Sequence, residues 1–449
     1  MMTKKWQPYP TYKDSGVEWL GAIPEHWKVK KLKYLAKINL SNVDKKSNEN
    51  EDTVKLCNYV DVYYNDYITK EIDFLIATAS HEQKQKFALK KGDVLLTKDS
   101  ETWDDIAVPA CVANDLDNVI CGYHLAHIRP YQDRAIGEYI FRSISSTRLK
   151  EQFWVAANGV TRFGISKSSI SDALLLEPPV SEQQKIAQFL DQETSKIDNL
   201  ITKKERLIKL LKEKRTALIS HAVTKGLNPD VPMKDSGVEW LGEIPEHWEM
   251  VKFSHFIDFQ EGPGIMADDF KDEGVPLLRI TNLKPGYVDI EGCNYLAIDK
   301  VEQKWKHFRL LANDLLISCS ASTGLVSIVD QKSANSIAYT GIIRLRPARN
   351  NIARDFIRVL VGSDFYFTQI NQLKTGTTIQ HYGPVHLKQI KIPIPPIPEQ
   401  QKIAQFLDRE TSKIDNLITK TRTSIDHLKE YRTALISAAV TGKIDVREH

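Results

Sequence analysis

Apolar residues recur at close to every seventh position from Ser181 to about His221, a segment without Gly or Pro. Their steps of 4, 7, 4, 7, 3 and 7 residues are typical of the seam of a coiled coil. The same stripe returns 217 residues later. The pattern predicts two long helices, each of about 38 residues and about 55–60 Å. The predicted seam residues are Ile186, Leu190, Ile197, Ile201, Ile208, Leu211 and Leu218 in the first helix and Ile403, Leu407, Ile414, Ile418, Ile425, Leu428 and Leu435 in the second.

The two helices belong to a repeat that extends beyond them. The string EQQKIAQFLD begins at Glu182 and again at Glu399, and only one of the first 22 positions of the two copies differs. A shorter motif, KDSGVEWLGAIPEHW at Lys13–Trp27, returns with one change at Lys234–Trp248. The short motif and the long helix thus occur twice in the same order, so the chain contains an internal repeat. Because a lone helix must bury its apolar stripe, we expect the two helices to pack on each other in antiparallel orientation.

Two regions between these repeats share a plan but differ in most residues. The strand-like run at Asp93–Leu96 matches the run at Asp314–Ser318, and a helical pattern follows each, at Ile136–Phe153 and Phe356–Ile370. The sequence thus predicts an α+β fold with an internal pseudo-twofold repeat, in which two similar α/β domains are separated by two long antiparallel helices that form a coiled coil. The predicted segments are 1–27 and 228–248 for the short motifs, 28–178 and 249–395 for the two domains, and 179–227 and 396–449 for the helices.

Composition adds few limits. The 449 residues carry a net charge of +3, so any basic surface must be local. The five cysteines form no Cys-x-x-Cys pair, which is typical of a reducing compartment. The start MMTKKWQPYP lacks an apolar signal core, and no apolar run of about 18 residues occurs. We expect a cytoplasmic protein.

The sequence offers little sign of catalysis. It has no Gly-x4-Gly-Lys-Ser/Thr loop for ATP. The paired prolines within Glu177–Val180 resemble an amino-methyltransferase motif but lack its Asn or Asp and its aromatic residue. Cys121, His124 and His127 could be metal ligands, but their spacing on a strand turns His124 away from the other two. We expect no catalytic residue, no metal and no cofactor in this chain.

Polar loops recur at matching places in the two domains. Arg can read guanine edges, Asn or Gln can read adenine, and Ser or Thr can hold phosphates. Each residue alone is an ordinary loop residue, and the recurrence is what favours DNA contact. The candidate DNA-binding residues are Thr97, Lys98, Ser100, Trp103, Asn158, Thr161 and Arg162 in the first domain and Arg279, Asn282, Ser320, Ser322, Lys374, Thr377, Thr378, Gln380 and His381 in the second.

With its two near-identical EQQKIAQFLD helices, the duplicated KDSGVEWLG motif and the PIPPIPEQ approach to the second helix, the chain resembles the specificity (S) subunit of a type I restriction–modification system. The resemblance covers essentially the whole sequence. It implies two target-recognition domains that each read one half of a split asymmetric site on double-stranded DNA. It also implies that the helices set the spacing of the half-sites and dock two modification (methyltransferase) subunits, with restriction subunits outside.

The resemblance further implies that the cofactors sit on the partners. S-adenosylmethionine would bind the modification subunits, and ATP with Mg the restriction subunits. The assembled complex, and not this chain, would then be an adenine-specific DNA methyltransferase and ATP-dependent endonuclease.

Two other classes of function are compatible with parts of the pattern. The domains could bind proteins, which would make the chain an interaction scaffold without a DNA target. Gel shifts at low and high salt separate these readings, because phosphate contacts make DNA affinity fall steeply with salt. An autonomous methyltransferase or nuclease is disfavoured by the missing motifs.

Overall fold

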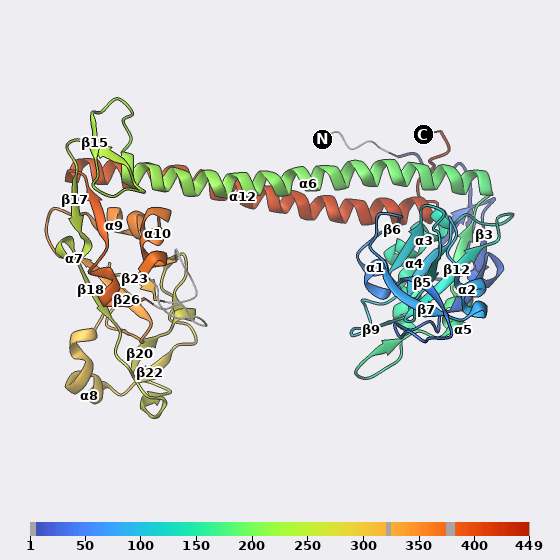
Figure 1. The fold of residues 1–449 in the computed structure, drawn as a ribbon, viewed down its shortest axis with the longest axis horizontal. Coiled ribbons are helices and arrows are strands. Elements are labelled where there is room, and N and C mark those ends of the chain that lie inside the picture. The colour runs from blue at the N-terminus through green and yellow to red at the C-terminus, as the bar shows by residue number, and fades with distance from the viewer. Residues whose placement is uncertain (1–5, 320–324, 374–381, 449) are drawn as a thin grey trace. The chain divides into compact units, whose positions relative to one another are not determined.

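The computed structural model of the protein describes residues 6–319, 325–373 and 382–448. It forms two compact units, the first made of Met1–Lys204 with Arg422–His449 and the second of Glu205–Thr421. Each unit contains one domain together with one part of each of two long helices, α6 (Val180–Lys225) and α12 (Ile397–Val440). Figure 1 shows α6 in green and α12 in red. The predicted α+β repeat of two similar domains and two long helices is confirmed.

The first domain is built on a five-stranded sheet of order β4-β12-β8-β10-β6 and a three-stranded sheet of order β11-β5-β7. Its strands are β3 (Lys28–Lys31), β4 (Ala36–Leu40), β5 (Asp52–Cys57), β6 (Tyr67–Ile68), β7 (Leu75–Ala79), β8 (Val94–Thr97), β9 (Asp99–Ser100), β10 (Pro109–Val112), β11 (Val119–Cys121), β12 (Leu125–Pro130), β13 (Phe163–Gly164) and β14 (Leu174–Glu177). Its helices are α1 (Tyr59–Tyr63), α2 (His81–Phe87), α3 (Gly137–Ser145), α4 (Thr147–Val155) and α5 (Lys167–Asp172). The short motif before it forms the hairpin of β1 (Tyr12–Asp14) and β2 (Ala22–Pro24).

Strand β8 begins with three apolar residues, Val94–Leu96, because both of its faces are covered. Val94 and Leu96 belong to the same buried cluster as the α3 residue Tyr139. Leu95 points the other way and shares a second cluster with the α1 residue Val62. A strand covered on both faces reads as a continuous apolar run, because alternate residues face opposite sides.

The second domain repeats this plan with a five-stranded sheet of order β18-β26-β23-β24-β21 and a four-stranded sheet of order β19-β22-β20-β25. Its strands are β17 (Glu249–Lys252), β18 (Ile257–Glu261), β19 (Phe270–Lys271), β20 (Val275–Leu278), β21 (Gly286–Tyr287), β22 (Asn294–Leu296), β23 (Leu315–Ser318), β24 (Val326–Ile328), β25 (Ile337–Ala338), β26 (Ile342–Pro347) and β27 (Lys391–Ile394). Its helices are α7 (Phe253–Phe256), α8 (Ile298–Lys300), α9 (Arg354–Val361), α10 (Asp364–Leu373) and α11 (Pro384–Leu387). The preceding hairpin is β15 (Met233–Asp235) with β16 (Glu243–Pro245).

Each predicted helical pattern after the sheet is two helices and not one. In the first domain α3 and α4 are separated by Ser146, whose backbone is extended. In the second domain α9 and α10 are separated at Gly362 and Ser363. The break lets the second helix turn back onto the domain.

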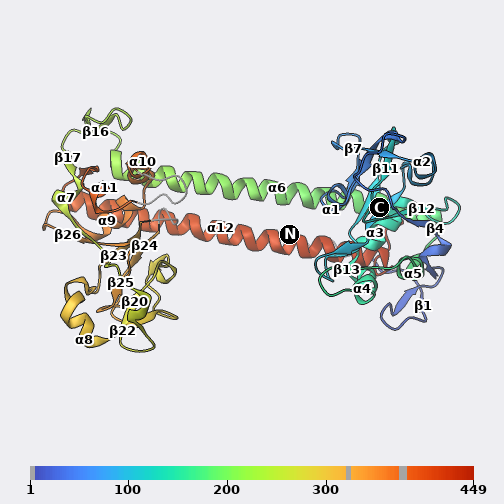
Figure 2. The same ribbon diagram turned by 60° about the horizontal axis from the view of Figure 1, so that its bottom comes forward.

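Within the first unit, the N-terminal part of α6 packs against the C-terminal part of α12. Ile186 and Leu190 share a buried cluster with Leu435 and Val440. In both views these parts of the two helices lie side by side (Figures 1 and 2). Since early residues of one helix meet late residues of the other, the pairing is antiparallel.

The second unit contains the complementary pairing. Ile219 and Val223, near the end of α6, share a buried cluster with Ile403 and Leu407, near the start of α12. Among the described residues, none of the helices has the length and apolar character needed to cross a bilayer. Of the seam residues, the structure buries Ile186, Leu190, Ile197, Ile403, Leu407, Ile414, Ile418, Ile425 and Leu435 and half-buries Ile201, Ile208, Leu211, Leu218 and Leu428.

Candidate nucleic-acid interface

The two polar segments proposed for the first domain come together as one surface. Strand β9 pairs antiparallel with β13, with Ser100 opposite Phe163 and Asp99 opposite Gly164. Asn158 and Gly164 exchange two backbone hydrogen bonds of 3.0 and 2.9 Å. Figure 1 labels β9 and Figure 2 labels β13 on this domain. Segments about 60 residues apart in sequence are thus one element, joined by a β ladder.

Arg162 is held in place on this surface by a carboxylate. Its Nη2 donates to Asp99 Oδ1 at 2.8 Å, while Asp99 Oδ2 contacts His124 Nδ1 at 2.8 Å. The Asp99 side chain is 15% exposed and that of Arg162 is 56% exposed. Arg162 therefore keeps donors facing outward from a fixed base, which suits the bidentate recognition of guanine or phosphate.

The other candidates of the first domain divide by exposure. Asn158, Thr161 and Trp103 are exposed, and the Trp103 ring meets Trp154 edge-on. Lys98 is half-buried, with its ammonium 4.6 Å from the centroid of the Tyr123 ring.

Thr97 and Ser100 are placed differently from the expectation. Both are buried, and the Thr97 hydroxyl accepts a hydrogen bond from the Val108 N–H at 2.9 Å. The reason is their position in β8 and β9, where pairing to neighbouring strands turns these side chains inward. The Thr97 hydroxyl therefore holds the loop, and Ser100, although largely buried, lies in the wall of a cavity that Arg162 also lines.

In the second domain, Arg279 is exposed and its guanidinium lies 5.9 Å from the centroid of the Phe270 ring. Asn282 is buried, and its side-chain oxygen accepts the Arg279 N–H at 2.8 Å, so its role is to cap the turn. Seven further candidates, Ser320, Ser322, Lys374, Thr377, Thr378, Gln380 and His381, lie outside the described residues.

The ends of the corresponding loops in the second domain also meet. Tyr382 donates its N–H to the Cys319 carbonyl at 3.1 Å and its hydroxyl to the Ser318 carbonyl at 2.8 Å. The chain leaving β23 therefore lies beside the chain that enters α11, as the chain leaving β8 lies beside the one that enters α5. Both domains use the same framework for their loops.

One glutamine in the first turn of each long helix was missed by pattern reading. The buried Gln183 accepts the Ile136 N–H at 3.1 Å and donates to the Arg134 carbonyl at 2.9 Å. Gln400 does the same with the Ala353 N–H at 2.8 Å and the Asn351 carbonyl at 3.0 Å. Their signal was the identical EQQ string, which looks like a polar helix start. Each glutamine fixes its domain to the first turn of a helix.

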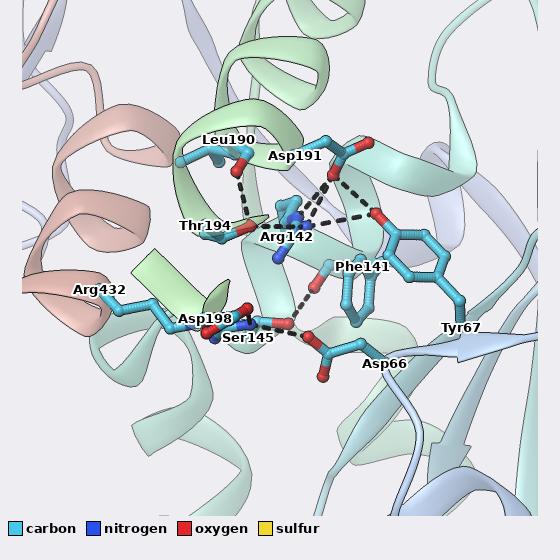
Figure 3. Close-up of polar contacts among 10 residues, drawn as sticks. All are labelled: Asp66, Tyr67, Phe141, Arg142, Ser145, Leu190, Asp191, Thr194, Asp198 and Arg432. Atoms are coloured by element: carbon cyan, nitrogen blue, oxygen red, sulfur yellow. Dashed lines mark hydrogen bonds and ion pairs between the residues drawn. The ribbon is translucent and has the colours of Figure 1, made fainter. Parts of the chain in front are cut away.

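A second tie joins each domain to its helices by an ion pair. In the first unit Arg142 of α3 donates from Nη2 to Asp191 Oδ1 at 2.7 Å, and the Tyr67 hydroxyl donates to the same oxygen at 2.6 Å (Figure 3). In the second unit Arg358 of α9 contacts both oxygens of Asp408 at 2.7 Å. The two aspartates are counterparts at an offset of 217 residues, whereas the arginines lie one position apart in the register of α3 and α9.

Between the helices, one ion pair is also duplicated. In the first unit Arg432 of α12 lies 2.9 Å from Asp198 of α6, and it also reaches Asp66 of the domain at 2.9 Å (Figure 3). In the second unit Arg215 of α6 lies 3.1 Å from Asp415 of α12. The offset of 217 residues makes these pairs counterparts.

The two units differ at this junction. By strand register, Tyr287 opposes Ile328 as Tyr67 opposes Cys111, so Gly286 occupies the position of Asp66. Tyr287 is 61% exposed, and a cavity of 610 Å³ lined by Arg215, Tyr287 and Asp408 lies where the first unit has its contacts. Among the described residues, the first domain thus makes more polar contacts with its helices at this junction than the second domain does.

The spacing of Cys121, His124 and His127 does not build a metal site. Cys121 is buried, His124 contacts Asp99, and the buried His127 contacts Asp93 at 2.9 Å. Over the described ranges, no three side chains of the metal-ligating types come together.

The fold and its repeat define a class of protein with two recognition domains. The domains share one framework, carry different loops, and are each joined to a segment of the paired helices. Comparison with known proteins gives the class a family. The family model described as the type I restriction modification DNA specificity domain matches twice, at residues 24–210 and 245–427. The chain belongs to this family.

Individual relatives agree with that assignment. The putative type I restriction enzyme MjaX specificity subunit of Methanocaldococcus jannaschii is 24% identical over 95% of this chain and 96% of its own length. The MjaVIII specificity subunit of the same organism is 27% identical over 69% of this chain and 70% of its own length. As in these specificity subunits, the role of the chain is recognition and not catalysis.

Solved structures show the same fold. A chain from a study titled "Structural basis underlying complex assembly and conformational transition of the type I R-M system" aligns with a TM-score of 0.71 at 15% identity, over 94% of this chain and 99% of that chain. The HsdS subunit from Thermoanaerobacter tengcongensis aligns with a TM-score of 0.57 at 15% identity, over 94% and 98%.

Proposed function

We propose that this chain is the DNA-reading subunit of a type I restriction–modification complex, in which the domain of residues 28–178 reads one half of a bipartite asymmetric site and that of residues 249–395 reads the other. The observation that carries the proposal is the double family match onto two domains of one topology. A similar framework with different loop residues is what two readers of two different DNA words need.

The helices, residues 179–227 and 396–449 with their seam, set the spacing between the half-sites. Two modest half-site affinities joined by such a spacer combine into one high affinity that depends on spacing. The duplicated ion pairs and the apolar clusters at both helix pairings support this role, because they keep the helices in one register.

The helices also dock two copies of the modification subunit. Leu207, Leu210 and Leu417 are exposed on α6 and α12 in the second unit, at 40%, 50% and 45%. Apolar side chains in water on a long helix favour a protein partner. The first 22 positions of the two helix copies differ at one residue, so two copies of one partner would find equivalent surfaces there. The later parts differ, since Leu207 and Leu210 are matched by Ser424 and His427 in the other copy.

The complex carries its chemistry elsewhere. S-adenosylmethionine binds the modification subunits, which methylate adenine, while restriction subunits with ATP and Mg join the assembly. The chain works where the cell's DNA lies, in the cytoplasm, which suits its free thiols.

The proposal is tested by expressing the chain with its modification subunit in a methylation-free host and sequencing the methylated adenines. We expect one bipartite motif with an unspecified spacer. Omission of the chain must abolish the motif. Methylation at a continuous site, or methylation without the chain, would contradict the proposal.

The scaffold alternative makes a different prediction for the purified complex. A DNA-reading subunit shifts a duplex that contains the motif, and its affinity falls steeply with salt. A protein-binding scaffold shifts no duplex in preference to a scrambled one.

A further inference from the structure

Helix α1 of the first domain has a counterpart among the predicted DNA-contacting segments of the second. It follows β5, whereas the turn at Ile280–Asn282 follows β20, and β5 and β20 hold equivalent places in their sheets. Both open with the same cap: the Asn58 N–H donates to the Asp61 carboxylate at 2.7 Å, as the Arg279 N–H donates to Asn282 at 2.8 Å. The sequence predicts DNA contact for the Arg279 segment but none for α1.

α1 lies beside the two loops joined by β9 and β13. A cavity of 500 Å³ is lined by Tyr59 and Tyr63 from the helix, by Tyr64 directly after it, and by Glu101 and Arg162 from the loops. In Figure 1, α1 and β9 lie on the same side of the domain. The helix and the loops therefore form one continuous surface.

The tyrosines of α1 are ordered by contacts with one another. The Tyr59 and Tyr63 rings stack with centroids 5.5 Å apart at 17°, and Tyr64 meets Tyr63 edge-on at 5.0 Å. The Tyr63 hydroxyl donates to Asp105 Oδ2 at 2.7 Å, and this hydrogen bond raises the pKa of Tyr63 to about 12.

Part of this face is apolar and open to water. Tyr64 is 78% exposed and Val60 is 54% exposed. On the loop side Val160 is 94% exposed and Trp103 is 52% exposed. A cluster of exposed apolar side chains around a fixed arginine marks an interaction surface, and such groups suit base faces and the thymine methyl group.

The charges indicate which part of DNA faces this surface. Glu101 is exposed and lines the same cavity as Arg162, and Asp104, three residues further along the chain, is also exposed. Carboxylates repel phosphates but accept a hydrogen bond from the amino group of cytosine, and an oriented arginine pairs with O6 and N7 of guanine. The surface therefore complements base edges and not the backbone.

We propose that α1 is a third base-reading element of the first domain, and that the surface it forms with the two loops reads a G·C pair, with Arg162 on guanine and the Glu101 carboxylate on the cytosine amino group. The major-groove edge of one G·C pair presents both partners side by side. Val60 and Tyr64 pack against the neighbouring base. The inference rests on the proposed function, because it requires the first domain to read DNA.

The test uses the chain assembled with its modification subunits and a random duplex library from which bound sequences are read. We expect the half-site assigned to residues 28–178 by domain exchange to contain a G·C pair. Arg162→Lys keeps the charge but loses the planar fork. Glu101→Gln removes the negative charge and replaces one of the two acceptor oxygens with an NH2 donor. Each lowers the preference for that G·C pair by about tenfold or more. Tyr64→Ala flattens preferences in that half-site alone.

Tyr131→Ala is the matched control, since Tyr131 is 42% exposed and follows the end of β12 away from His124. It leaves both half-sites unchanged, and thermal melting confirms that every variant folds. A first half-site without a G·C pair, or unchanged preferences in the three variants, would overturn the inference. If the wild-type complex selects no bipartite site, the proposed function itself fails, which is a separate outcome.

Discussion

At the scale of single residues, the glutamate at the start of each long helix makes different contacts in the two copies. Glu182 Oε1 accepts the Tyr9 hydroxyl at 2.6 Å and the Trp27 N–H at 3.0 Å. Its counterpart Glu399 accepts the Trp248 N–H at 3.1 Å, and the position that matches Tyr9 is Asp230. Both glutamates are also contacted by a histidine at 2.8 Å.

Removing these carboxylates should destabilise the two units unequally. Glu182→Ala leaves the Tyr9 hydroxyl and the Trp27 N–H without their acceptor and is expected to cost about 3 kcal/mol, whereas Glu399→Ala should cost about 1–2 kcal/mol. Denaturant unfolding followed by hydrogen exchange in each unit measures the two losses. Equal losses in the two variants would count against this account.

A buried carboxylate in the first domain predicts acid sensitivity. Burial alone raises the pKa of Asp93, but hydrogen bonds from Arg129 and His127 outweigh it and hold the pKa below its usual value. Since the folded pKa is lower than the unfolded one, the stabilisation is full at neutral pH. It is lost as the pH falls below about 4 and through the folded pKa.

Asp93→Asn should therefore lower the free energy of unfolding most at neutral pH, and the difference from the wild type should shrink in acid. Unfolding curves between neutral and acid pH give this difference directly. Asp117→Asn, at an exposed position, serves as the control and should show no such trend. A difference that is constant with pH would refute the assignment.

At the scale of elements, the periodicity of apolar residues predicted the elements that depend on local sequence. The seven-residue stripe and its copy predicted the two long helices and their antiparallel pairing, because a helix with an apolar seam must bury it. Pattern reading missed α1, since Tyr59–Tyr63 is rich in residues with strand preference, although Asn58 followed by Asp61 carried the cap signal. It also placed Thr97 and Ser100 at the surface, because only the strand pairing shows that they point inward.

Lengthening the helix pair should lengthen the DNA spacer. Four residues inserted between Thr216 and Ala217, with four more between Ile414 and Asp415 on the opposing helix, add about one turn, or about 6 Å. We expect the unspecified spacer of the methylated motif to grow by about two base pairs, at about 3.4 Å each. Insertion into α6 alone breaks the Arg215–Asp415 register and should reduce methylation. An unchanged spacer in the double insertion would show that the length of the helices does not set the distance between the half-sites.

At the scale of the whole molecule, the two units share one framework and differ in the loops that the framework carries. The two family matches, the equivalent sheets and the duplicated glutamine and ion-pair ties are common to both units. The loops are not. The DNA sequence that each domain recognises cannot be predicted from the amino-acid sequence, because the residues that contact bases follow no shared pattern.

Exchange of one domain should change half of the target. Residues 28–178 replaced by the corresponding domain of another family member carry both β3 and β14, so the strand pair that closes the domain stays intact. Methylome sequencing should show a new first half-site, the same second half-site and the same spacer. The reciprocal exchange of 249–395 should do the opposite. A change in both halves from either exchange would disprove independent readers.

The unequal junctions bear on how chains of this kind diversify. An incoming domain at the first position must supply both an acid and a tyrosine in the places of Asp66 and Tyr67 to meet Arg432 and Asp191. An incoming domain at the second position needs chiefly an arginine for Asp408, since Gly286 and Tyr287 hold no such partner contact in the described structure. Recombination should therefore succeed more often at the second position, and lineages that share these helices should differ most in the second half of the sites they protect.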